Sequence, residues 1–178
     1  MHWSQRETMQ PHDPQPLARP AKAAYRRNLP HFQADGKPLF VTFSTCKRWV
    51  LPESVRSLVL EHCLHDHGTR LHMHVAVVMP DHVHLLFTAR SDDYGNTFGL
   101  SEILSGIKGA SAHRINRVLG RKGHVWQDES FDHVLRCDEN LHEKAEYICQ
   151  NPVRRNLVTS PDLYPWLWCE WVEGQQRS

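Results

Sequence analysis

The 178-residue sequence lacks the features that would place it in several special classes of protein. It has no run of about 18 apolar residues, the length that a membrane-crossing helix needs. Residues 1 to 29 contain no apolar core of a secretory signal. The five cysteines include no Cys-x-x-Cys pair, and the chain has no internal repeat or low-complexity tract. We therefore expect a cytoplasmic protein with reduced thiols and a single folded domain.

A strong net charge is also absent, because 21 lysines and arginines face 20 acids and give a formal charge of +1. This total argues weakly against nucleic-acid binding, since phosphates attract basic surfaces. The distribution is uneven, however: residues 101 to 127 hold five basic side chains and only one acid, Glu102. We predict that basic side chains in three segments contact the DNA backbone, with a merely solvated face as the alternative. They are Lys47, Arg48, Lys108, Arg114, Arg117, Arg121, Lys122, Arg154 and Arg155.

The sequence pattern predicts a flexible arm followed by an α+β domain. Residues 1 to 30 contain five prolines and few large apolar groups, which is typical of a flexible, basic arm. Residues 31 to 178 form the predicted domain, which includes a tryptophan-rich tail. Hydrophobic periodicity there predicts strands at 39–46, 72–78, 82–87 and 125–136, and helices at 52–65, 100–119 and 138–151. This order indicates a ferredoxin-like (RRM-like) antiparallel sheet with helices packed on one face.

The pattern also predicts how two helices begin or end. Ser101 is a suitable residue to cap the helix at 100–119. Pro152 disfavours helical geometry at Asn151, so the regular part of the third helix should end there. The tail carries Trp166, Trp168 and Trp171, which we expect to pack over the core.

The sharpest local motif is a pair of histidines in the predicted strand at 82–87. Residues two apart in a strand point to the same face, so His82 and His84 present two imidazoles side by side. Such a pair can hold one divalent cation. A chain with 14 histidines also produces this spacing by chance, and on the spacing alone chance is the better explanation.

A second motif lies in the predicted third helix. Tyr147 and Asn151 are four residues apart, so their side chains emerge on one helix face. A tyrosine hydroxyl and an amide oxygen there could serve as a nucleophile and a metal ligand. A half-buried tyrosine beside a helix-ending asparagine is the simpler interpretation of this motif by itself.

Together the motifs resemble the tyrosine transposases of the HUH superfamily, and in particular the IS200-like branch associated with bacterial repetitive extragenic palindromes (REP). The resemblance covers about residues 35 to 168. It is carried by Met79-Pro80-Asp81-His82-Val83-His84, the helix around 108–116, Val125-Trp126-Gln127 through Phe131-Asp132-His133, and Tyr147-Ile148 with Asn151-Pro152-Val153. One departure is Asn156, where the family usually has glycine. We expect Asn156 to accept left-handed geometry at a helix end.

The resemblance implies a metal-dependent endonuclease and strand transferase. It implies Tyr147 as the nucleophile, and a Mg²⁺ or Mn²⁺ ion bound by His82, His84 and Asn151. The implied product is a 5′-phosphotyrosine with a free 3′-hydroxyl. The implied partner is single-stranded or hairpin DNA, handled by a monomer, with a dimer as the alternative.

Three other functions remain open on the sequence. A non-catalytic nucleic-acid-binding module could keep the same fold. A metal-dependent hydrolase could use water and would not need Tyr147. A zinc protein could use the histidine-rich segment at 62–74, although its spacings match no familiar zinc finger. That segment contains His62, Cys63, His65, His67, His72 and His74.

Overall fold

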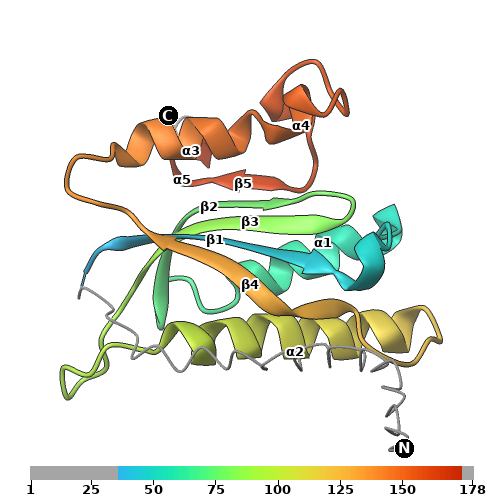
Figure 1. Cartoon of the computed structure of the whole chain (residues 1–178), viewed down its shortest axis with the longest axis horizontal. Coiled ribbons are helices and arrows are strands. Elements are labelled where there is room, and N and C mark those ends of the chain that lie inside the picture. Colours follow the sequence, from blue (N-terminus) through green and yellow to red (C-terminus); the bar gives the residue numbers. More distant parts are fainter. Residues whose placement is uncertain (1–35, 174–178) are drawn as a thin grey trace, which may run out of the picture. The chain divides into compact units, whose positions relative to one another are not determined.

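The computed structural model describes residues 36–173, so the arm predicted at residues 1 to 30 lies outside the described residues. The described chain has its main strands and helices in the predicted order, with a short 3-10 helix added after the first strand and further short elements added after the third helix (Figure 1). The elements are β1 (Pro38–Thr45), η1 (Cys46–Arg48), α1 (Glu53–Leu64), β2 (Leu71–Val78), β3 (His82–Ala89), α2 (Leu100–Val118), β4 (Trp126–Val134), α3 (Leu141–Cys149), α4 (Asn151–Arg154), η2 (Pro161–Leu163), β5 (Leu167–Cys169) and α5 (Glu170–Glu173).

The strands form one five-stranded sheet in the order β4-β1-β3-β2-β5. Every pair of neighbouring strands is antiparallel. The units β1-α1-β2 and β3-α2-β4 each leave room for one strand between their own two, which is the ferredoxin-like arrangement. The predicted α+β fold with an antiparallel sheet is therefore confirmed, and β5 extends the sheet beyond β2.

Helices α1 and α2 pack on one face of the sheet, as predicted, and α3 lies over part of the other face (Figure 1). The sequence prediction did not include this second layer. The second layer forms because the strands are apolar on both faces. Phe40, Val75 and Leu86 form a second core with Ala145 and Ile148 of α3. Such burial on both faces stabilises the sheet by roughly 25 cal/mol per Å² of apolar surface removed from water.

Two expected helix boundaries are corrected by the structure. Gly99 occupies the N-cap position of α2, so Ser101 lies inside the helix and caps nothing. Helix α3 ends at Cys149, and Asn151 begins the short α4 with Pro152 in its first turn. A proline there loses no hydrogen bond, because the first N–H groups of a helix have no partner within it.

The tail and the turn after α4 agree with the expectations from the sequence. Trp166 and Trp168 are partly buried against the α1/α2 core, and Trp171 packs on the α3 core. Asn156 adopts a φ of 54°, the left-handed geometry expected of it. Within residues 36–173, no helix is long and apolar enough to cross a membrane.

Candidate active site

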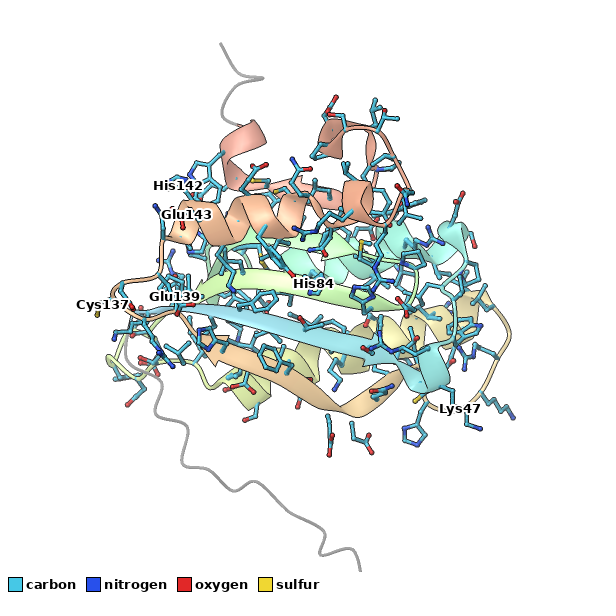
Figure 2. All side chains as sticks on the ribbon, turned by 45° about the horizontal axis from the view of Figure 1, so that its top comes forward. Lys47, His84, Cys137, Glu139, His142 and Glu143 are labelled. Carbon is cyan, nitrogen blue, oxygen red and sulfur yellow. The ribbon has the colours of Figure 1, made fainter. Side chains whose placement is uncertain are left out.

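The two histidines of β3 converge on a single point. Both point to the sheet face that carries α3, and Figure 2 shows His84 on this side of β3. The Nε2 atoms of His82 and His84 lie 3.1 Å apart. Their Nδ1 atoms are held from outside the pair: His82 by the Asp81 carboxylate at 2.5 Å, and His84 by the Thr42 hydroxyl at 2.7 Å. Thr42 reaches His84 because the two residues are register partners between β1 and β3.

This arrangement fits a divalent cation. Metal-binding histidines usually hydrogen-bond an outer group through their other ring nitrogen, which fixes the ring and its tautomer. Here both outer groups bind Nδ1, and both Nε2 atoms are left facing one another. Without an ion, one Nε2–H must donate to the other Nε2. With an ion, both rings carry the proton on Nδ1 and offer two lone pairs.

The electrostatics keep both imidazoles neutral, as a metal ligand must be. Burial lowers the pKa of His84 to about 3, with further contributions from His82 and the positive charges of Arg154 and Arg155. Burial also lowers the pKa of His82, and this effect outweighs the opposing influence of Asp81. For Asp81, burial raises the pKa, but the hydrogen bond with His82 and the charge of Arg48 outweigh burial and lower it.

Helix α3 presents Tyr147 beside this pair. The Tyr147 side chain is 52% exposed, so its hydroxyl is accessible to a large substrate. Lys144, one turn earlier, places Nζ 5.7 Å from the Tyr147 ring and 4.8 Å from the ring of Phe40. Phe40 in turn stacks on His84 with ring centroids 5.7 Å apart. Continuous contacts therefore link the tyrosine of α3 to the histidine pair of β3.

Asn151 lies half-buried at the start of α4. Its Nδ2 donates to two carbonyl oxygens at the end of α3, those of Tyr147 at 3.3 Å and Ile148 at 3.2 Å. Since Nδ2 must face these acceptors, Oδ1 lies on the opposite side of the amide. The side chain thus ties the start of α4 to the end of the helix that carries Tyr147, and Oδ1 takes no part in these two bonds.

Comparison with known proteins identifies the family. Residues 40–151 match the family described as "Transposase IS200 like". The chain belongs to this family. The matched segment is more than half of the chain and contains His82, His84, Tyr147 and Asn151.

Individual relatives of this IS200-like chain agree with the assignment. The Haemophilus influenzae protein named "Putative REP-associated tyrosine transposase" is 26% identical over 94 residues, which are 50% of this chain and 53% of that protein. This chain thus aligns with about half of that relative's length. A solved structure described as a REP-associated tyrosine transposase bound to a REP hairpin superimposes with a TM-score of 0.56 and 22% identity, and covers 75% of this chain and 76% of that one. At that identity, the second match supports the fold.

Most of the basic residues predicted to bind DNA fall into two groups in this IS200-like chain. One group surrounds the histidine pair: Arg48 pairs with Asp81 at 3.3 Å, and the guanidinium of Arg154 lies 3.9 Å from the centroid of the Tyr147 ring. This group consists of Arg48, Arg154 and Arg155, whose charges lower the pKa of one or both histidines. Lys47 lies in η1, and Arg121 lies beside it over Trp49 at 4.0 Å.

The second group lies along α2, on the opposite face of the sheet. Lys108 donates to the carbonyl oxygen of Asp128 at 3.0 Å and to Ser130 Oγ at 3.3 Å. Arg114 pairs with Glu61 of α1 at 3.3 Å. These bonds fasten α2 to β4 and α1. The remaining members, Arg117 and Lys122, are exposed.

The histidine-rich segment at 62–74 does not form one cluster. Cys63 lies on the buried face of α1, where burial raises the pKa of its thiol to about 12, so it offers no thiolate. His65 binds the carboxylate of Asp66, and His67 accepts the backbone N–H of Met73. Within this segment only His72 and His74, both in β2, share one acid, Glu170.

Sequence reasoning missed the aromatic surface beside the histidine pair. Phe131 of β4 is 61% exposed and makes an edge contact with Phe40 at 6.1 Å. It also pairs in register with Thr42. The period-2 alternation of β4 separates the residues of its two faces. The sequence does not say which face stays exposed, because that depends on where α3 packs.

Proposed function

We propose that this IS200-like chain nicks single-stranded DNA and joins itself to it through Tyr147, with Mg²⁺ or Mn²⁺ held by His82, His84 and Asn151. The observation that carries the proposal is the convergence of two neutral imidazole Nε2 atoms beneath a helix with an accessible tyrosine. Imidazole and amide ligands carry no charge. An ion held by them keeps its full charge for phosphate oxygens and water.

The reaction is a balanced transesterification. The Tyr147 oxygen forms a bond to phosphorus and loses its proton, the bond from phosphorus to the 3′-oxygen breaks, and that oxygen gains a proton. The products are a 5′-phosphotyrosine and a free 3′-hydroxyl. One ester replaces another, so the same hydroxyl can later attack the adduct and rejoin strands without ATP. The bound ion would supply charge stabilisation at the phosphate.

The side chains around the site position the substrate. Arg154 donates to the backbone carbonyl of Tyr147 at 2.5 Å and covers the tyrosine ring, which fixes the orientation of the nucleophile. Lys144, Arg48 and Arg155 add positive charge on the same side of the sheet. Charge there attracts the DNA backbone and stabilises the phosphate as negative charge develops.

The open face beside β4 is suited to unpaired bases. An exposed ring such as Phe131 can stack a base of any sequence, and this favours single strands over duplex. We propose a hairpin with single-stranded flanks as the substrate, because the structural relative was solved with a REP hairpin. We propose a monomer as the active unit, with a dimer as the alternative.

The deciding experiment is a covalent-adduct assay. The full chain is mixed with labelled hairpin DNA and Mg²⁺ or Mn²⁺, then run on a denaturing gel. We expect a metal-dependent protein–DNA band that disappears in Tyr147→Phe. Tyr94→Phe is the matched control, since Tyr94 is 91% exposed in the turn between β3 and α2.

The other outcomes separate the competing functions. Cleavage by Tyr147→Phe without an adduct would favour a hydrolase that uses water. Binding without any cleavage, across several hairpins and both metals, would favour a nucleic-acid-binding module.

A further inference from the structure

A second His-x-His pair lies on β2 and faces an acid from the end of the chain. His72 Nε2 lies 2.8 Å from Glu170 Oε1, and His74 Nδ1 lies 3.1 Å from Glu170 Oε2. One nitrogen from each ring and a carboxylate oxygen all lie within 4.8 Å of one another. Glu170 begins α5 directly after β5, so these contacts join the C-terminal segment to the neighbouring strand β2.

The local backbone accounts for the position of His74. The β2–β3 register shifts between Met73 and Val75, which leaves His74 as the extra residue of a bulge. Bulges commonly redirect a side chain. Here the bulge lets His74 reach both Glu170 and Thr88 of β3.

Thr88 gives His74 the outer partner that a metal-binding histidine needs. The Thr88 hydroxyl lies 2.9 Å from His74 Nε2. A hydroxyl can either donate or accept, so Nε2 can carry the proton and leave a lone pair on Nδ1 toward Glu170. The ring then needs no rotation to become a ligand. Thr42 supports His84 in the same way at the other histidine pair.

The cluster is partly sheltered yet reachable from solvent. The His74 side chain is 9% exposed and stacks on Trp171 with ring centroids 6.0 Å apart. His72 and Glu170 are 40% and 36% exposed, which leaves a route for an ion. His67 lies near His72 but is not a fourth ligand as placed, because its Nδ1 accepts the Met73 N–H and its neutral ring therefore carries the proton on Nε2.

We propose that His72, His74 and Glu170 bind a Zn²⁺ ion that fastens the β5–α5 segment to β2. Two imidazoles and one carboxylate form a ligand set that zinc accepts, with water completing the tetrahedron. Imidazole is a ligand that suits Zn²⁺. The zinc site is separate from the β3 histidine pair. His72 is paired with Thr88, which lies four residues along β3 from His84 and six from His82. At about 3.3 Å per residue these separations are roughly 13 and 20 Å.

The proposed zinc site would also support the helix that carries the tyrosine. Cys169 of β5 and Trp171 of α5 belong to the core under α3. The ring centroids of His142, at the start of α3, and Trp171 lie 4.5 Å apart, and Figure 2 places His142 at that end of the helix. Zinc at Glu170 would therefore hold part of the surface on which α3 packs.

The test measures zinc binding rather than cleavage. The full chain is stripped with chelator and titrated with Zn²⁺ against a chromophoric competitor. We expect Glu170→Gln to lose one equivalent of zinc and Thr88→Val to bind that equivalent about tenfold more weakly. The matched control is Glu139→Gln, since Glu139 makes a similar contact with a single histidine, His133, at 2.8 Å.

The outcomes separate this site from the β3 pair. The His82→Gln/His84→Gln double variant should keep the equivalent that Glu170→Gln loses. Equal zinc binding by Glu170→Gln, Glu139→Gln and the wild type would overturn the proposal. Hydrogen exchange should slow at residues 167–171 when zinc is added, and unchanged exchange despite zinc binding would overturn the fastening role.

Discussion

Acid should destabilise the metal-free protein through His84. Burial lowers the pKa of this ring to about 3 in the folded chain, whereas the ordinary value of 6.5 applies after unfolding. Between these two values the unfolded chain binds more protons than the folded one. The contribution of His84 to stability is therefore complete above pH 6.5 and is lost progressively as the pH falls towards 3.

The magnitude follows from the two pKa values. At pH 5, an unfolded pKa of 6.5 favours protonation of the unfolded ring by about 1.5 pH units, while the folded ring stays almost fully neutral. At about 1.36 kcal/mol per unit, the free energy of unfolding falls by about 2 kcal/mol from pH 7.5 to pH 5. A folded pKa near 4 would give nearly the same loss.

The assay is urea denaturation in chelator at several pH values for the wild type, His84→Gln and the matched control His113→Gln, an exposed histidine on α2. Between pH 7.5 and pH 5, the free energy of unfolding of His84→Gln should fall by about 2 kcal/mol less than that of the wild type. His113→Gln shows the effect of replacing an exposed histidine. Circular dichroism at pH 7.5 checks that each variant is folded. Parallel stability–pH curves for all three proteins would refute the reasoning.

Three further predictions concern single side chains. Thr42→Val removes the outer partner of His84 and should weaken Mn²⁺ binding about tenfold, measured by titration calorimetry. Phe131→Ala should weaken single-stranded DNA binding by about 1–3 kcal/mol in fluorescence anisotropy, with little change in Tm because the ring is exposed. Trp126→Phe removes the buried indole bond to Ser111 Oγ at 3.0 Å and should lower the free energy of unfolding by about 1–3 kcal/mol, measured by denaturation.

The local features of the site could be predicted from the sequence because they depend on short spacings. Period-2 alternation placed His82 and His84 on one face. Helical spacing predicted Tyr147 and Asn151 on one face of a single helix, whereas α3 ends at Cys149 and Asn151 begins α4. The supporting residues could not be predicted in this way. Thr42 reaches His84 only through the β1–β3 register, which depends on the packing of the whole sheet.

The second layer was missed for a related physical reason. Val75 and Val77 of β2 face α3, whereas Ala76 and Val78 face α1 and α2. A strand that is apolar on both faces shows no alternation, and its sequence cannot reveal which helix covers which face. Glu170 is 96 residues from His74, so no local pattern connects them.

The two His-x-His pairs have the same spacing but different chemistry, and their partners make the difference. At His82 and His84 the outer groups hold both Nδ1 atoms, so two neutral Nε2 atoms face one another and favour a cation from outside. At His72 and His74 a carboxylate already lies between the rings. In the proposed function, the first pair would give an ion few ligands and no negative charge, so the ion could still bind a phosphate. At the proposed zinc site, Glu170 would add a ligand and a negative charge from the protein itself, which suits an ion that stays bound whether or not DNA is present.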